Sequence, residues 1–128
     1  MMNTVLICDD EPHVTRLIAV KLDRAGFDVQ TAAHAETVWQ LLHRDLPAVL
    51  ILDYHMPGRD GVPFLEQLRE EDAFADLPVI LLVPPDVELG DDAFRLRSLG
   101  VTATVRKPFS ARRLVALVEE AIGCAAVS

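Results

Sequence analysis

Short runs of uninterrupted apolar residues alternate along the chain with segments whose apolar residues recur every three or four positions. Val5–Cys8, Ala48–Leu52 and Pro78–Val83 are typical of these runs, and each is followed directly by an acidic residue or a proline. A strand that is apolar throughout has both faces buried, whereas a spacing of three and four marks one face of a helix. The alternation therefore predicts a sheet covered by helices on both faces.

Five such strand and helix units are predicted, and residue types typical of helix ends mark several boundaries. Pro12 suits a first helical turn and Gly26 a helix end, while Asp60 and Ser110 are predicted N-caps. The predicted strands are 5–8, 27–31, 48–52, 78–83 and 101–105, and the predicted helices lie around 12–25, 35–42, 60–68, 92–99 and 110–122. From the first helix, the residues predicted to face inward are Val14, Leu17, Ile18, Leu22 and Ala25.

Strict alternation of this kind predicts an α/β fold with a parallel sheet. Five units suit the flavodoxin-like, doubly wound arrangement with strand order 2-1-3-4-5, and we expect residues 1–128 to form a single domain. Ligands of such folds bind outside the carboxyl ends of the strands, where the order reverses between the first and third. We therefore look for function at those strand ends.

Acidic residues and one lysine follow the strands that meet there. Asp9, Asp10 and Glu11 follow the first strand, Asp53 follows the third and Lys107 the fifth. Neighbouring carboxylates repel one another unless a cation neutralises them, and oxygen ligands with room for water suit Mg²⁺. A lysine ammonium pairs well with phosphoryl oxygens. The pattern predicts a Mg²⁺ site in which Asp53 is the nucleophile toward a phosphoryl group.

Each of these residues also has a simpler interpretation. Asp9 and Asp10 could cap the first helix, Asp53 could be a turn residue and Lys107 an ordinary surface lysine. The side chain of His55 is expected in solvent, because a single histidine in a loop carries no ligand pattern. Three further histidines are predicted as polar surface residues of helices, namely His13, His34 and His43.

Charge and composition limit the partners and the compartment. The chain has 12 basic and 20 acidic residues, and a net charge of −8 disfavours direct binding to nucleic acid or to an anionic membrane. No apolar stretch is long enough for a membrane span and the first residues have no basic leader, so we expect a cytoplasmic protein. Cys8 and Cys124 have no metal-binding spacing and are predicted to be free thiols.

The motifs at the strand ends resemble those of response regulator receiver domains of two-component signalling, including the chemotaxis type. The resemblance rests on Asp9-Asp10, on Asp53 with Met56-Pro57 and Gly61 behind it, and on Lys107-Pro108-Phe109, which occur in order and at the family's spacings. Each motif is weak alone. Together, at the strand ends of a five-unit α/β chain, they cover nearly the whole sequence.

The resemblance implies a signalling domain that catalyses only its own phosphorylation and dephosphorylation. Asp53 would take a phosphoryl group from a histidine kinase or a histidine phosphotransfer protein. Asp10 and Asp53 would hold Mg²⁺ directly, Asp9 would act mainly through water, and the backbone carbonyl of His55 would complete the protein ligands. Lys107 would contact the phosphoryl oxygens, next to a cis bond to Pro108.

Two positions depart from the family in a way that bears on its conformational switch. Val83 stands where most receivers have Ser or Thr, and Thr104 where the family has an aromatic residue three positions before the lysine. The missing hydroxyl is expected to cost the phosphorylated state about 1.5–3 kcal/mol. Pro84 and Pro85 follow in a connection that looks longer than usual, which predicts a stiffer loop or a displaced fourth helix.

Two alternatives to phosphoryl signalling remain. The chain could be an atypical receiver that binds a partner or dimerises irrespective of phosphate, through the face of the last two helices and the fifth strand. A haloacid-dehalogenase-like phosphatase also uses an aspartate nucleophile, but it needs an Asp-x-Asp motif. The chain has His55 two residues after Asp53, which argues against that class.

Overall fold

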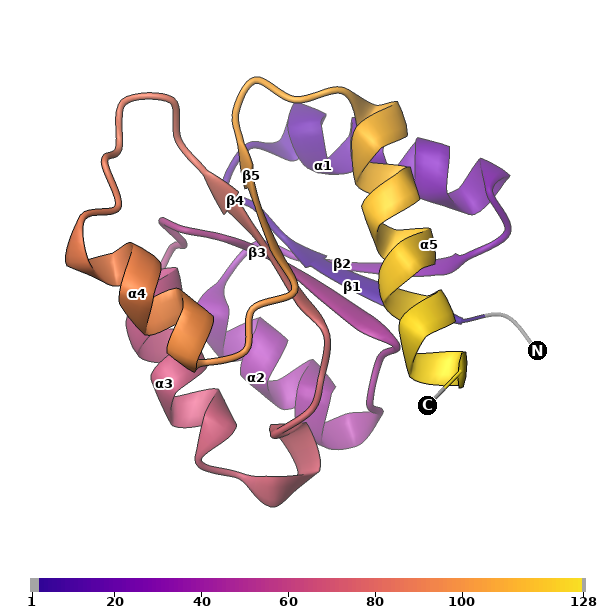
Figure 1. Cartoon of the computed structure of the whole chain (residues 1–128). Coiled ribbons are helices and arrows are strands. Elements are labelled where there is room, and N and C mark those ends of the chain that lie inside the picture. Colours follow the sequence, from indigo (N-terminus) through magenta and orange to yellow (C-terminus); the bar gives the residue numbers. More distant parts are fainter. Residues whose placement is uncertain (1–2, 128) are drawn as a thin grey trace.

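Five parallel strands form one sheet in the computed structural model, in the order β2-β1-β3-β4-β5 (Figure 1). The structure describes residues 3–127, and side chains over 3–123. The strands are β1 (Thr4–Cys8), β2 (Asp28–Ala32), β3 (Val49–Asp53), β4 (Val79–Val83) and β5 (Ala103–Arg106). The predicted flavodoxin-like fold and strand order are confirmed.

Helices cover both faces of this sheet, with α1 and α5 on one side and α2, α3 and α4 on the other (Figure 1). Their bounds are α1 (Pro12–Arg24), α2 (Ala35–Arg44), α3 (Gly61–Arg69), α4 (Asp91–Ser98) and α5 (Ala111–Val127), with a 3₁₀ turn η1 (Asp72–Phe74) after α3. Among the described residues, no helix is long and apolar enough to cross a membrane.

Both faces of the central strands are buried, as the apolar runs predict. Every residue of β3 and of β4 is buried. Ile51 and Ile80 pack into the core under α1 and α5, whereas Leu52 and Leu81 pack into the core under α2, α3 and α4. Burial of alternate side chains on opposite faces makes a rigid centre, and the residues that follow these strands extend from it.

The predicted strands 27–31 and 101–105 start too early. The amide of Phe27 donates to the carbonyl of Leu22, and that of Val101 donates to Leu96, so both amides close the helix before them. A backbone amide that caps a helix is not available to a sheet ladder. β2 therefore begins at Asp28 and β5 at Ala103.

The inward face of α1 is narrower than its apolar spacing predicts. Ile18 and Leu22 are buried and Val14 packs against the same core, but Leu17 is 54% exposed and Ala25 is an exposed C-cap. A surface helix buries only the stripe that meets its neighbours. The expectation that Leu17 and Ala25 face the core is wrong.

Helix caps confirm two predicted positions, Ser110 and Asp60, and correct one, His34. Ser110 Oγ accepts the amide of Arg113 at 3.0 Å, as predicted for the cap of α5. Asp60 occupies the N-cap position of α3, but its side chain caps no amide. His34 precedes α2 instead of lying within it, and its Nδ1 accepts the amide of Glu36 at 3.1 Å.

Candidate phosphoryl and metal site

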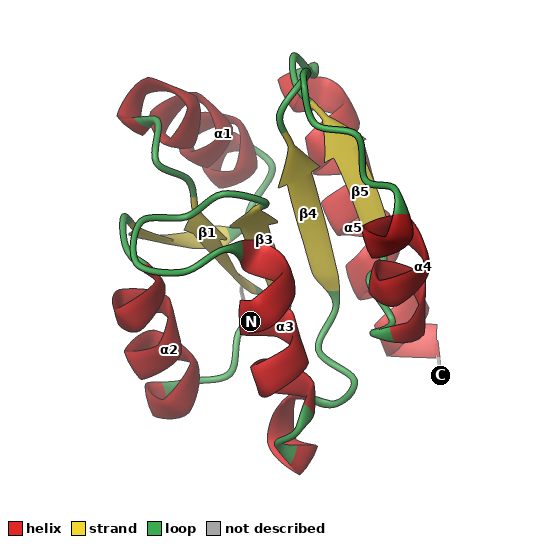
Figure 2. Ribbon diagram, turned by 90° about the vertical axis from the view of Figure 1, so that its left-hand side faces the viewer, coloured by secondary structure: helices red, strands yellow, loops and turns green. Residues whose placement is uncertain are grey.

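Three aspartates meet at the carboxyl ends of β1 and β3, the point where the strand order reverses. Asp9, Asp10 and Asp53 each place one carboxylate oxygen within 4.8 Å of the others. Asp9 is 3% exposed and Asp53 2% exposed, whereas Asp10 lies at the surface. The strands β3, β4 and β5 run in the same direction, so their carboxyl ends lie on one edge of the sheet (Figure 2).

Lys107, which follows β5, extends its ammonium into this cluster. Its Nζ donates to Asp53 Oδ2 at 3.1 Å, to Glu11 Oε1 at 3.2 Å and to Asp9 Oδ1 at 3.3 Å. Asp9 Oδ2 also lies 3.1 Å from Nζ, an ion pair outside hydrogen-bond geometry. The peptide bond from Lys107 to Pro108 is cis, as the resemblance implies.

Glu11 is a member of the cluster to which the sequence assigned no role. Besides accepting from Lys107, Glu11 donates its backbone amide to Asp9 Oδ1 at 2.9 Å. Glu11 thus positions a buried carboxylate with its backbone and a lysine with its side chain. The contact to Lys107 joins residues 96 positions apart, so no local pattern announces it.

The electrostatics of the cluster are those of buried like charges beside one cation. Burial, followed by the charge of Asp9, raises the pKa of Asp53 to about 7, although Lys107 opposes the shift. Burial alone lowers the pKa of Lys107, but hydrogen bonds and charges of Asp53 and Asp9 raise it above its ordinary value. One ammonium therefore leaves the carboxylates with excess negative charge.

The residues present fit a hard divalent cation. Asp53 Oδ1 is buried and accepts no hydrogen bond from the described residues, which is costly for a carboxylate oxygen. Asp10 and Asp53 offer oxygen ligands of the kind that Mg²⁺ prefers, and surface exposure of Asp10 leaves room for water. A cation here would neutralise the excess charge.

The imidazole of His55 contacts Asp60, which is not a member of the carboxylate cluster. Its Nδ1 lies 3.1 Å from Asp60 Oδ1, and the side chain is 54% exposed. This agrees with the expectation that the imidazole lies in solvent. The carboxylate of Asp60 that was predicted to cap α3 makes this contact instead.

Comparison with known proteins places the chain in a family. Residues 5–119 match the family model of the response regulator receiver domain. The chain belongs to the response regulator receiver family. Response regulator Rre1 of Synechocystis sp. is 37% identical over 116 residues, which are 90% of this chain and 49% of that protein. The phosphate regulon transcriptional regulatory protein PhoB of Pseudomonas aeruginosa is 31% identical over 113 residues, 88% of this chain and 48% of that protein.

Solved structures agree with this membership. The receiver domain of Francisella response regulator 1452 superposes with a TM-score of 0.85 at 25% identity, covering 96% of this chain and 98% of that one. The chain spans about half the length of the two curated relatives. The matched part of the chain is a receiver domain.

Val83 and Thr104, the two positions at which the sequence departs from the expected family pattern, lie at the end of β4 and within β5. Val83 ends β4, is 1% exposed and accepts the amide of Lys107 through its carbonyl at 2.8 Å. Thr104 is exposed on β5 and lines a 270 Å³ hollow with Ala93 and Leu96 of α4. Val83 has no hydroxyl and Thr104 has no aromatic ring.

The connection from β4 to α4, residues 84–90, is held by an arginine of β5. Arg106 donates from Nη1 to the carbonyls of Val87 at 2.5 Å and Pro84 at 3.1 Å. Gly90 enters α4 with a φ of +53° and no side-chain cap. Proline and these bonds both limit the conformations open to the loop, and its stiffness stays a prediction.

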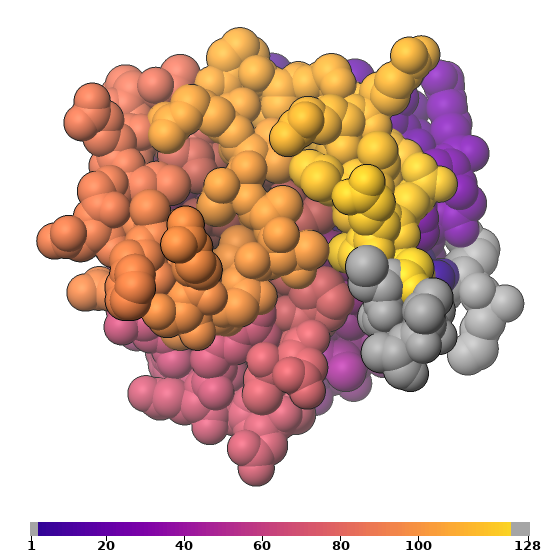
Figure 3. All heavy atoms as spheres, viewed as in Figure 1, coloured from indigo at the N-terminus to yellow at the C-terminus, as the bar shows by residue number. Residues whose placement is uncertain are grey.

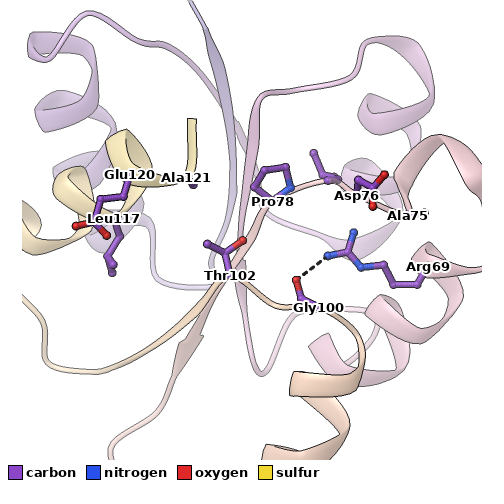
Figure 4. Close-up of a pocket in the computed structure, with 10 residues that line it drawn as sticks. Arg69, Ala75, Asp76, Pro78, Gly100, Thr102, Leu117, Glu120 and Ala121 are labelled. Atoms are coloured by element: carbon purple, nitrogen blue, oxygen red, sulfur yellow. Dashed lines mark hydrogen bonds between the residues drawn. The ribbon is translucent and has the colours of Figure 1, made fainter. Parts of the chain in front are cut away.

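Two further polar groups, which the sequence did not single out, connect elements away from the site. Arg69 lines a 440 Å³ hollow at the opposite edge of the sheet, where it donates to the carbonyl of Gly100 (Figure 4). It also donates to the carbonyls of Leu99 and Phe74. His43 donates to the carbonyl of Trp39 and pairs with Glu71. These contacts are structural, and the far hollow holds none of the predicted site residues.

One of the two cysteines predicted to be free thiols is buried next to the site. Cys8 is a buried free thiol at the end of β1, and burial with the neighbouring aspartate charges raises its pKa to about 12. It is therefore a protonated, apolar filler below the site. Cys124 lies outside the residues whose side chains are described.

Proposed function

We propose that this receiver domain accepts a phosphoryl group on Asp53 and passes the resulting change to a partner. The observation that carries the proposal is the buried carboxylate of Asp53, which is clustered with Asp9 and Asp10. Its Oδ2 accepts from Lys107 at 3.1 Å, while its Oδ1 has no partner among the described residues. Membership in the response regulator family supports it.

The residues that would hold Mg²⁺ are Asp10, Asp53 and the backbone carbonyl of His55, with Asp9 acting mainly through water. The carboxylates cluster within 4.8 Å, which supports this assignment. When bound, Mg²⁺ neutralises the developing charge on phosphoryl oxygens. In the resting chain Lys107 neutralises part of the carboxylate charge, and Glu11 keeps its ammonium at the site.

In the proposed reaction, an oxygen of Asp53 attacks the phosphorus of a phosphohistidine. The new O–P bond forms as the P–N bond breaks, and the electron pair of that bond stays on the imidazole nitrogen, which binds a proton. Lys107 leaves Asp53 Oδ2, 3.1 Å away in the resting chain, and pairs with a phosphoryl oxygen. The donor would be a histidine kinase or a histidine phosphotransfer protein, in the cytoplasm.

Mass spectrometry with acetyl phosphate and Mg²⁺ tests this function directly. We expect a mass increase of one phosphoryl group, absent in Asp53→Asn and present in the control Asp60→Asn, whose carboxylate is exposed and lies outside the cluster. Loss of the adduct on removal of Mg²⁺ with EDTA tests the cation. No adduct with acetyl phosphate or with a phosphorylated histidine kinase would refute the proposal.

A phosphate-independent binding module is a second candidate, favoured by Val83 and Thr104. The face formed by α4, β5 and α5 is continuous at the surface (Figure 3), and Phe94 of α4 is 73% exposed on it. An exposed phenylalanine suits a second copy of the domain or an effector. The affinity of self-association or of partner binding tests this candidate. It is favoured if Phe94→Ala lowers that affinity and Asp53→Ala leaves it unchanged. A tenfold change in affinity with Asp53→Ala would exclude it.

A further inference from the structure

Tyr54 joins the phosphoryl site to α4 in a way that neither atypical position explains. It directly follows Asp53, and its hydroxyl donates to Asp92 Oδ2 in the first turn of α4 at 2.5 Å. A tyrosine hydroxyl is protonated at neutral pH and an ionised carboxylate only accepts, so the hydroxyl is the donor. The contact spans 38 positions of sequence.

The backbone of Tyr54 is held from two sides. Its amide donates to the carbonyl of Leu82 in β4 at 2.8 Å, and its carbonyl accepts the amide of Gly61 at the start of α3 at 2.8 Å. A Cβ on Gly61 would meet the carbonyl oxygen of Asp53 at 2.8 Å, so α3 lies directly against this backbone. Close packing leaves little slack, and a rearrangement at Asp53 therefore has to pass into its neighbours.

α4 is attached weakly enough for one hydrogen bond to matter. Leu96 is the one buried residue of α4, and the side of α4 that lies beside Thr104 borders the 270 Å³ hollow. The ion pair of Arg95 with Glu66 is 3.8 Å long and half exposed, and such surface pairs contribute little. A hydrogen bond to a carboxylate is worth more, so Tyr54 supplies a large share of what holds the first turn of α4.

We propose that Tyr54 transmits the state of the Asp53 site to α4, through the hydroxyl that holds Asp92 in the resting domain. This inference rests on the proposed function. The proposed ligands to Mg²⁺ and phosphate lie on both sides of Tyr54, at Asp53 and at the carbonyl of His55. Their engagement reorients the backbone between them, which weakens the bond to Asp92 and frees the first turn of α4. Tyr54 is a positioning residue in this scheme, and it replaces the hydroxyl and aromatic pair of other receivers.

Amide hydrogen exchange of residues 91–98 tests the inference, with and without Mg²⁺ and beryllofluoride as the phosphoryl mimic. In the wild-type domain we expect amide exchange of α4 to accelerate roughly tenfold on adding the mimic. This is the smallest change expected when a hydrogen bond to a charged group is lost. In Tyr54→Phe, exchange should already be fast and should not change further. Asp92→Asn keeps an acceptor for Tyr54 but loses its charge and its 3.9 Å ion pair with Arg95, so its exchange should lie between those of wild type and Tyr54→Phe.

Asp91→Asn is the matched control for Asp92→Asn. It removes the same charge from the same helical turn, but Asp91 makes no hydrogen bond or ion pair through its side chain within residues 3–123, so it should behave as wild type. Tyr54 is the only tyrosine of the chain, so its labelled ring gives a single NMR signal that reports the change independently. That signal should shift with the mimic in wild type and in Asp91→Asn.

The outcomes separate this inference from the proposed function. Amides of Asp53 and Gly61 report whether the mimic occupies the site. If these amides respond but α4 exchange in Tyr54→Phe equals that of wild type in both states, transmission through Tyr54 is refuted while phosphoryl binding stands. If these amides do not respond in any variant, the proposed function fails and the inference fails with it.

Discussion

Replacing Asp53 with asparagine should stabilise the metal-free domain, although it removes the proposed phosphoacceptor. Asp53 is 2% exposed and shares the site with Asp9 and Asp10, so its charge opposes folding when no cation is present. Asparagine keeps the shape and removes the charge. Lys107 retains Asp9 and Glu11 as partners after the substitution.

The pKa of Asp53 sets the size of the effect. Folding raises it from 3.8 to about 7, mainly through burial and then through the charge of Asp9. A tenfold change in an ionisation constant is worth about 1.4 kcal/mol, so the ionised carboxylate destabilises the fold by at most about 4 kcal/mol. Asparagine brings amide hydrogens that need partners, which offsets part of this gain. We expect a net stabilisation of about 1–3 kcal/mol at pH 8.

The gain should depend on pH in a defined direction. An acid whose pKa is higher in the folded chain binds a proton that the unfolded chain has already released, so the free energy of unfolding of the wild type falls as pH rises from about 4 to about 7. The free energy of unfolding of Asp53→Asn does not fall in this way, because asparagine does not titrate. The two proteins should therefore differ little on this account at pH 4, and the difference should be complete above pH 7.

Urea unfolding followed by circular dichroism measures both quantities, in EDTA and in Mg²⁺. Mg²⁺ should stabilise the wild type and have little effect on Asp53→Asn, because a cation that binds only the folded site adds to its stability. Asp60→Asn is the control and should match the wild type. A variant less stable than wild type in EDTA at pH 8 would refute the assigned electrostatics.

Three further predictions address separate parts of the domain. Val83→Thr supplies a hydroxyl beside the site and should tighten beryllofluoride binding about tenfold or more. Because the hydroxyl is buried, the substitution should also lower the free energy of unfolding by about 1–3 kcal/mol. A titration that gives unchanged beryllofluoride binding would contradict this prediction. Arg69→Met removes the donors that three backbone carbonyls accept from. The free energy of unfolding, measured with urea, should fall by about 2–3 kcal/mol, and a loss below about 1 kcal/mol would contradict the structural role of Arg69. The hydrogen bond of His43 to the Trp39 carbonyl, and then its bond to Glu71, raises the pKa of His43 above 6.5. The stability that the protonated imidazole adds is therefore complete below pH 6.5 and is lost as pH rises through the pKa of the folded chain. An NMR titration that gives a pKa of 6.5 or less for His43 would disprove this.

Local patterns were enough to predict the fold and the composition of the site. Fully apolar runs such as those of β3 and β4 need cover on both faces wherever they occur, so they reveal the parallel sheet without knowledge of its neighbours. The strand order then places residues that follow the first, third and fifth strands at one edge. For this reason Asp9, Asp53 and Lys107 could be grouped from the sequence alone.

Tertiary structure decided the contacts between distant segments and the boundaries that depend on them. The bond of Tyr54 to Asp92 and that of Glu11 to Lys107 depend on where α4 and β5 pack, and side-chain identity alone does not specify that packing. The exposure of Leu17 follows from how little of α1 its neighbours cover. Sequence periodicity gives the apolar face of an element, but only packing determines how much of that face is buried and which polar groups meet across it.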